Sequence, residues 1–102
     1  GAKRGAYILR EPKGTPDVIL IASGSEVELV LRAADVLAVQ GYTARIVSMP
    51  CMELFEQQDE AYRESVLPKS LRKRVAPAGE LFRAFGFTPE NVAKAALEVI
   101  RG

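Results

Sequence analysis

The chain has 102 residues, of which 48% are hydrophobic and 26% charged, a composition typical of one soluble globular domain. The formal net charge of +1 excludes the strong positive field that marks nucleic-acid or membrane-surface binding. The longest apolar run, Val18–Ala22, is too short to span a bilayer. The single cysteine, Cys51, cannot form an internal disulfide and fits a reducing compartment, so we expect a cytoplasmic protein.

Two strands are expected near the N-terminus. The short apolar stretch from Ala6 to Leu9 is closed by Pro12 and Gly14, which predicts an edge strand followed by a turn. Val18–Ala22 is a continuous aliphatic run, typical of a strand that is covered on both faces.

A helix is expected from Glu26 to about Gln40. Gly41 follows it and can adopt the left-handed conformation that ends many helices. At the other end, Ser25 and Glu28 have the spacing of a capping box, in which the hydroxyl and the carboxylate bind each other's backbone amides. Glu28 and Arg32 are also spaced for an ion pair along the helix.

The apolar surface of this helix extends beyond a single stripe. Leu29, Val36 and Val39 lie outside the main apolar face, and only a narrow polar line remains. We therefore expect the helix to pack on its sheet and also on a second surface, with these three residues as candidate interface residues.

The rest of the chain predicts a further alternation of strands and helices. A second buried strand, Thr43 to Ser48, should run parallel to the first buried strand. The basic cluster of Lys69, Arg72, Lys73 and Arg74 is interpreted as a solvated loop. The other expected elements are helices at Glu53–Gln58 and Glu60–Val66, a weak parallel strand at Arg74–Ala76, a helix at Glu80–Phe85, and a last helix capped by Thr88 that starts with Pro89 and ends near Arg101.

The turn Ser23-Gly24-Ser25 is the best local candidate for a ligand site. Free amides and the helix dipole at a helix N-terminus attract phosphate or carboxylate, and ligands of open α/β sheets bind at the carboxyl ends of strands. The turn lacks the glycine spacing of a dinucleotide fingerprint or a P-loop. A tight turn that caps the helix is therefore the favoured interpretation, with an anion site as the alternative.

No other group of residues predicts catalysis or metal binding. Cys51 stands at the expected start of a helix, but the chain contains no histidine to act as its base. The acidic residues form a solvated face of two short helices rather than a convergent metal site: Glu53, Glu56, Asp59, Glu60 and Glu64. Tyr62 is expected in the core with its hydroxyl near the surface, and Phe82, Phe85 and Phe87 are expected to anchor the last helix.

Six segments in order resemble one family. GAYIL, ASGSEV, ARIVSMP, ELFEQQ, AYRESVLP and LFRAFGFTPENV together are similar to the C-terminal domain of transketolases. The resemblance covers nearly the whole chain and implies a three-layer α/β/α sandwich, with a mostly parallel sheet and one antiparallel edge strand. The stretch 1–102 is expected to be a single domain of this kind.

The resemblance also implies a function for the parent enzyme. Transketolases move a two-carbon ketol unit between sugar phosphates, using thiamine diphosphate and a divalent cation, Mg or Ca, held between their other domains in a dimer. This chain would be the C-terminal structural and interface domain, inactive alone, with no catalytic residue, cofactor or metal of its own. The alternative is a free-standing module that binds an anion at Ser23–Glu26; an independent enzyme is least favoured.

The chain departs from the family pattern at Val75-Ala76-Pro77. There the family continues into a further strand and its connections, which are missing near residues 76–77. Either the deletion is real, or the protein contains these residues and they are absent from the 102-residue sequence and its numbering. The second explanation is favoured, because a real deletion would expose strand 74–76 as an unpaired edge and remove aromatic surface from a small core.

Overall fold

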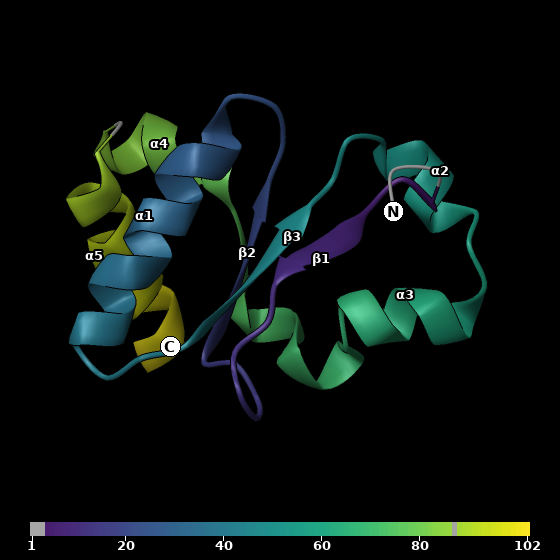
Figure 1. Ribbon diagram of the computed structural model, residues 1–102, viewed down its shortest axis with the longest axis horizontal. Helices are drawn as coiled ribbons and strands as arrows, with labels where there is room; N and C mark the ends of the chain where they lie inside the picture. The colour runs from purple at the N-terminus through teal and green to yellow at the C-terminus, as the bar shows by residue number, and fades with distance from the viewer. Residues whose placement is uncertain (1–3, 87) are drawn as a thin grey trace.

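The computed structural model describes residues 4–86 and 88–102 and shows, within them, a four-stranded sheet with helices on both faces (Figure 1). The strands lie in the order β1-β3-β2-β4. β2 pairs in parallel with β3 and with β4, whereas β1 runs antiparallel to β3 at one margin. The expected α/β sandwich with one antiparallel edge strand is therefore confirmed. The strand bounds are β1 Tyr7–Arg10, β2 Val18–Ala22, β3 Ala44–Ser48 and β4 Val75–Pro77.

One face of the sheet carries the larger core. It is covered by α1 (Glu26–Val39), α4 (Ala78–Phe85) and α5 (Pro89–Arg101), which stand together on one side of the strands in Figure 1. Alternate residues of β2, such as Leu20, point into this layer, because successive side chains of a strand face opposite ways. Leu37 of α1 is fully buried in the same cluster.

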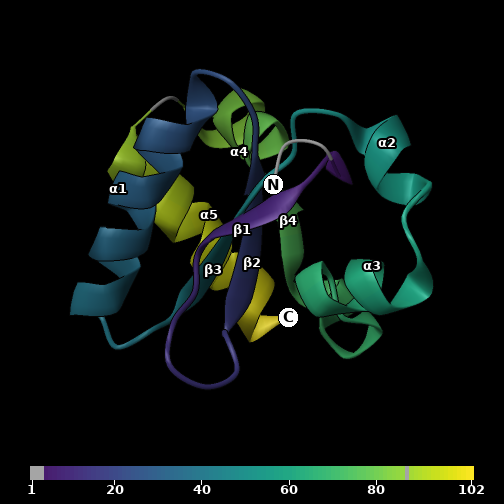
Figure 2. The ribbon, with the colours of Figure 1, turned by 45° about the vertical axis from the view of Figure 1, so that its right-hand side comes forward.

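The other face carries a smaller core. It is covered by α2 (Met52–Glu56), α3 (Glu60–Val66) and a 3-10 helix, η2 (Lys69–Arg74). Figure 2 shows α2 and α3 on the side of the sheet opposite α1 and α5 (Figure 2). Ile19 of β2 and Val66 of α3 are among its buried residues.

Local signals set the helix ends as expected. Gly41 has φ +91°, and the amides of Gly41 and Tyr42 donate to the carbonyls of Ala38 and Leu37, which is the Schellman arrangement at the end of α1. The Thr88 hydroxyl accepts from the amide of Asn91 at 3.1 Å and caps α5.

Two expectations about the segment before β4 and after it are corrected. The basic cluster interpreted as a loop forms η2, although it is exposed as expected. The next helix begins at Ala78 rather than at Glu80, since β4 ends at Pro77, whose fixed φ suits the position before a helix. Across the described residues, the structure contains no helix with the length and apolar character needed to cross a membrane.

The aromatic cluster expected near the C-terminus lies partly outside the described residues. Phe82 is buried in the larger core. Phe87 is not among the described residues, and the side chain of Phe85 is not described either. The cluster therefore stays a prediction.

Candidate functional site

The turn formed by Ser23, Gly24 and Ser25 joins β2 to α1 and is exposed. It lies at the end of the sheet where β2 and β4 run into their helices, at the top of Figure 1. The carboxyl ends of parallel strands are where open α/β sheets bind ligands. The candidate turn thus has the location that such a site requires.

The turn is closed in a different way from the one expected, because the capping box of Ser25 and Glu28 does not form. Ser25 already has helical dihedral angles, φ −68° and ψ −13°, and its hydroxyl makes no capping hydrogen bond. Glu28 instead pairs with Arg32 at 3.0 Å, as its spacing predicted. The carboxylate that closes the turn is that of Glu26, whose Oε1 accepts a hydrogen bond from the amide of Ser23 at 3.2 Å.

A hollow of about 320 Å³ opens beside this turn. Residues at the carboxyl ends of β2 and β4, and Met49 just after β3, form its apolar wall. Its charged lining residues are Glu26, Glu80 and Arg83. Since α1 and α4 both begin here, the partial positive charges of two helix N-termini converge on the hollow.

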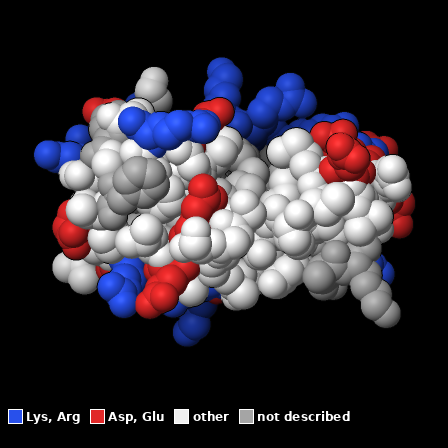
Figure 3. All heavy atoms as spheres, turned by 90° about the horizontal axis from the view of Figure 1, so that it is seen from above, with Lys and Arg blue, Asp and Glu red and all other residues white. Residues whose placement is uncertain are grey.

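The carboxylate of Glu26 already occupies the space between these two helix starts. Its Oε2 lies 2.9 Å from the position that a Cβ on Gly79 would take, so it is in close contact with the first turn of α4. An incoming anion would meet this negative charge at short range and be repelled by it. Figure 3, a view of this end of the molecule, shows acidic side chains among the basic ones (Figure 3). The chain thus supplies its own anion at the turn.

The three candidate interface residues of α1 differ in exposure. Leu29 and Val36 are half-buried and pack against the larger core. Val39 at the end of the helix is 89% exposed, which leaves a large apolar side chain in water. A hollow of about 310 Å³ lies next to Val36, between α1 and α5. The apolar surface available for a second contact is therefore concentrated at the C-terminal half of α1.

The remaining sequence candidates are dispersed over the smaller face. Cys51 is exposed at the start of α2, and its side chain forms no cap there. Asp59 caps α3 by accepting from the amide of Tyr62 at 2.7 Å. Glu60 pairs with Lys69 at 3.2 Å. Within residues 4–86 and 88–102, no three His, Cys, Asp or Glu side chains come together in a way that could hold a metal ion.

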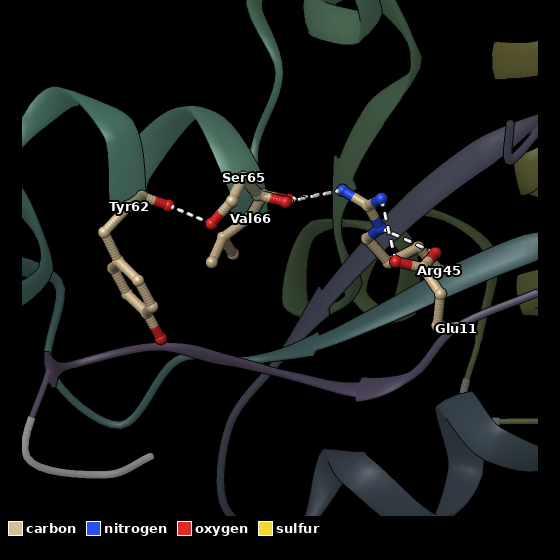
Figure 4. Close-up of polar contacts among 5 residues, drawn as sticks. All are labelled: Glu11, Arg45, Tyr62, Ser65 and Val66. Carbon is tan, nitrogen blue, oxygen red and sulfur yellow. Dashed lines mark hydrogen bonds and ion pairs between the residues drawn. The ribbon is translucent and has the colours of Figure 1, made fainter.

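Among the described residues, a well-connected polar side chain is one that the sequence did not lead us to single out. Arg45 on β3 is 12% exposed and pairs with Glu11, with 2.9 Å between Nη2 and Oε2. Its Nη1 also donates to the carbonyls of Ser65 and Val66, at 3.1 and 3.0 Å. Figure 4 shows this guanidinium between the loop that holds Glu11 and the end of α3 (Figure 4). The contacts tie α3 to the sheet, and they give the arginine a structural task.

A signal for Arg45 was present in the sequence. An arginine inside the apolar strand 43–48 must find partners for its charge, because a buried charge is costly unless it is paired and hydrogen-bonded. The sequence therefore predicts that Arg45 is paired and hydrogen-bonded, but it does not show that the partners are Glu11 and the carbonyls at the end of α3.

Comparison with known proteins places this geometry in one family. The family model "Transketolase-like TK C-terminal domain" matches residues 5–79. Transketolase 2 of Aliivibrio fischeri is 42% identical over 126 aligned residues, which cover 95% of this chain and 19% of that protein. The chain therefore spans only about a fifth of the length of this curated relative. The aligned stretch is also longer than the whole chain of 102 residues, so the relative contains residues without a counterpart here.

Solved structures show the same likeness. A transketolase of Pichia stipitis in complex with sedoheptulose-7-phosphate matches 98% of this chain with a TM-score of 0.79 and 33% identity, over 18% of its own length. The structure titled "Split gene transketolase, inactive beta4 tetramer" matches 97% of this chain and 42% of its own chain, with a TM-score of 0.62 and 21% identity. The second likeness supports the fold alone.

Proposed function

The chain belongs to the transketolase family, in which it corresponds to the C-terminal domain, and we propose that it serves as a structural and interface domain without catalytic activity of its own. The parent enzyme of this proposal transfers a two-carbon ketol unit between sugar phosphates. A cytoplasmic location goes with it, since a reducing compartment keeps the exposed Cys51 as a thiol.

One observation carries the proposal. α/β enzymes bind their ligands at this end of the sheet. Here the chain's own Glu26 carboxylate lies between the starts of α1 and α4, where it accepts a hydrogen bond from the Ser23 amide and lies against Gly79. A domain that fills its ligand position with its own carboxylate is suited to a structural role.

The cofactors of the parent enzyme do not fit the described residues. Thiamine diphosphate needs donors for its diphosphate and a divalent cation needs convergent oxygen ligands. Here Glu26 repels a diphosphate at the turn, and the acidic side chains of α2 and α3 do not converge. We therefore assign the cofactor and the cation, Mg or Ca, to other domains of the parent, and no chemical step involves this chain.

The partners in this proposal are the other transketolase domains, within a homodimer of the parent. Val39, Val36 and Leu29 are the residues of α1 that we assign to this contact. Val39 is the clearest of the three, because an exposed valine gains about 1.5 kcal/mol or more when it is fully buried.

A chimera tests the interface role. The matched stretch of Aliivibrio fischeri transketolase 2 would be replaced by this chain, and amide hydrogen exchange of α1 would be compared between the chimera and the isolated chain. We expect slower exchange at the C-terminal end of α1 in the chimera, and weaker assembly after Val39→Asp. Ala61→Asp, at an exposed position of α3 on the other face of the sheet, is the control. Equal exchange of α1 in both proteins would refute the proposed contact.

The alternative of an anion-binding module has its own test. Isothermal titration of the isolated chain with sugar phosphates and nucleotides would compare the wild type with Ser25→Ala and Glu26→Gln. We expect no heat from the wild type. A tight site that is lost in Ser25→Ala would establish the module instead. Binding that appears only in Glu26→Gln would support the view that this carboxylate closes the site.

A further inference from the structure

Residues 51–67, which contain α2 and α3, are attached loosely to the rest of the domain. Each of the two helices buries a single side chain, Phe55 in α2 and Val66 in α3, whereas α1 buries four. Among residues 4–86 and 88–102, no main-chain hydrogen bond joins this segment to a strand of the sheet. Segments with little buried apolar surface are the ones that open at the lowest free energy.

The N-terminal residues 4–6, which we call the strap, lie against both helices. Gly5 is buried with φ +84°, and a Cβ at this position would overlap the main chain of α2. Its carbonyl accepts a hydrogen bond from the amide of Cys51 at 3.0 Å. The carbonyl of Ala6 accepts one from the Tyr62 hydroxyl at 2.6 Å, and Figure 4 shows this hydroxyl pointing to the N-terminal ribbon. The strap therefore binds the start of α2 and the side of α3 at the same time.

Two prolines mark the ends of the segment. Pro50 stands directly before it and Pro68 directly after it. Because proline has no amide proton, no amide hydrogen bond ties the chain at these two positions. The amide of Met49 donates to the carbonyl of Ala22 at 2.9 Å and keeps the chain on the sheet up to the first proline. The segment can therefore move away from the sheet without breaking any strand pairing.

Arg45 links the segment to β3, and its charge stays paired when the segment moves. Its Nη1 donates to the carbonyls of Ser65 and Val66, at 3.1 and 3.0 Å, while its Nη2 pairs with Glu11 at 2.9 Å. Glu11 lies outside the segment, so the guanidinium keeps this carboxylate after α3 has left. Opening is costly where it leaves a buried charge without a partner, and here it leaves none.

We propose that residues 51–67 form a flap that opens as one unit, while the sheet, α1, α4 and α5 stay folded, and that the strap holds it closed. Opening separates Cys51 and Tyr62 from the strap and uncovers apolar residues of the sheet that are fully buried in the closed state, among them Ile19 and Val47. The strap thus decides whether this apolar face of the sheet is covered. The inference does not depend on the proposed function, because this chain contains every residue that takes part.

The test is native-state hydrogen exchange of the 102-residue chain at rising urea concentrations below its unfolding transition. Each amide then reports the free energy and the urea dependence of the opening that exposes it. The probes are the amides of Phe55 in α2 and Leu67 at the end of α3, which donate to the carbonyls of Cys51 and Arg63. We expect both to report one opening free energy. It should be lower than that of the α1 and α5 amides and depend less on urea, because less surface is exposed.

Two substitutions test the role of the strap. Tyr62→Phe removes a hydrogen bond between α3 and the strap, and it should accelerate exchange about fivefold at Leu67 and equally at Phe55, because both helices open together. A hydroxyl that stabilised α3 alone would leave Phe55 unchanged. Gly5→Ala displaces the strap from α2 and should accelerate both amides about a hundredfold.

Val92→Ala is the control on the other face of the sheet. Val92 is fully buried in α5 and stays buried when the flap opens. The substitution should accelerate amides of α1 and α5 that exchange by global unfolding more than about tenfold, and it should leave those of the flap within about twofold. Circular dichroism of each variant checks that it is folded.

Three outcomes would overturn the inference. The first is the same opening free energy and urea dependence for the flap and for α1, which would mean that the domain opens only as a whole. The second is a different opening free energy for α2 and α3, or no protection in either, which would mean that they form no closed unit. The third is acceleration of only one of the two helices by Tyr62→Phe, or acceleration of the flap by Val92→Ala as large as that of α1.

Discussion

The two faces of the sheet are built in different ways. On the face of α1, α4 and α5, helices of 14, 8 and 13 residues bury a continuous apolar cluster that includes Val30, Leu37 and Val92. On the face of α2 and α3, the helices are only 5 and 7 residues long, and the buried cluster is smaller. The first face depends mainly on apolar burial, which scales with the area removed from water. Its polar contact to the sheet, the ion pair of Arg10 on β1 with Asp35 on α1 at 2.8 Å, is exposed to solvent.

The second face relies on individual contacts between distant segments. Arg45 binds the last carbonyls of α3, and the Tyr62 hydroxyl donates to the carbonyl of Ala6 at 2.6 Å. The rings of Tyr62 and Phe55 pack edge to face. The guanidinium carbon of Arg4 lies 4.6 Å from the centre of the Tyr62 ring. Where apolar area is scarce, hydrogen bonds between distant segments and close backbone contacts hold short helices in place. Single substitutions should therefore show, through the loss of unfolding free energy, whether each face depends on apolar burial or on individual polar contacts.

The largest effect is expected for Gly5→Ala. Gly5 has φ +84°, and an added Cβ would overlap the carbonyl oxygen of Cys51 and the amide nitrogen of Phe55. Backbone strain and overlap together should lower the free energy of unfolding by about 3 kcal/mol, measured by urea denaturation. Gly14→Ala is the control, because Gly14 has φ +77° but open space around it. Equal losses in both variants would mean that α2 does not pack closely on this segment.

The same substitution on both faces compares their packing directly. Val92→Ala removes a fully buried side chain from α5, and Val66→Ala removes one of 2% exposure from α3. We expect losses of unfolding free energy of about 2.5 kcal/mol and about 1 kcal/mol, because the thinner layer can collapse into the cavity more readily. Urea denaturation of both variants measures the difference. A larger loss for Val66→Ala would contradict the contrast between the faces.

Arg45→Met tests the polar tie of the thinner face. The substitution keeps most of the apolar stem and removes bonds to Glu11 and to two carbonyls of α3. The free energy of unfolding should fall by about 2 kcal/mol, because hydrogen bonds of a charged group in a partly dry site are the strong ones. Amide exchange should accelerate in α3 more than in α5.

The matched surface control for Arg45 is Arg32→Met. Arg32 pairs with Glu28 while 65% of its side chain is exposed, and such pairs contribute about 0.5 kcal/mol or less. A similar loss in both variants would show that the Arg45 cluster is an ordinary surface ion pair.

A smaller effect than that of Arg45→Met is expected for Tyr62→Phe. The loss of the hydroxyl leaves the Ala6 carbonyl without this donor and should cost about 1 kcal/mol in urea denaturation. Tyr42→Phe is the control, because Tyr42 is also half-buried but its hydroxyl makes no hydrogen bond with the described residues. If Tyr42→Phe lowers the free energy of unfolding as much as Tyr62→Phe does, the hydrogen bond from Tyr62 to the Ala6 carbonyl does not account for the effect.

The local elements were readable from the sequence because their causes are local. The aliphatic run Val18–Ala22 predicted a buried strand, Gly41 predicted the end of α1, and Thr88 with Pro89 predicted the start of α5. Each of these signals depends on residues a few positions apart, so no knowledge of the fold was needed. The family resemblance added the order of the layers and the antiparallel β1.

The candidate site was predictable in place but not in chemistry. Ser23 to Ser25 lie at the expected end of the sheet, yet the choice between Glu26 and Glu28 as the carboxylate that closes the turn depends on the dihedral angles of Ser25. Those angles follow from how α1 leaves β2 and meets α4 near Gly79, which no local pattern encodes.

By itself, the sequence determined most of the strands and helices, the helix ends at Gly41 and Thr88, and the family, because periodicity and capping act within a few residues. Only the tertiary structure decided that Glu26 fills the ligand position, that Arg45 ties α3 to the sheet and that Val39 stays exposed. These outcomes depend on segments about twenty or more residues apart in the chain, or on which side chains a neighbouring helix covers. Such distances are set by the packing of layers, and the packing exists only once the whole sheet has formed.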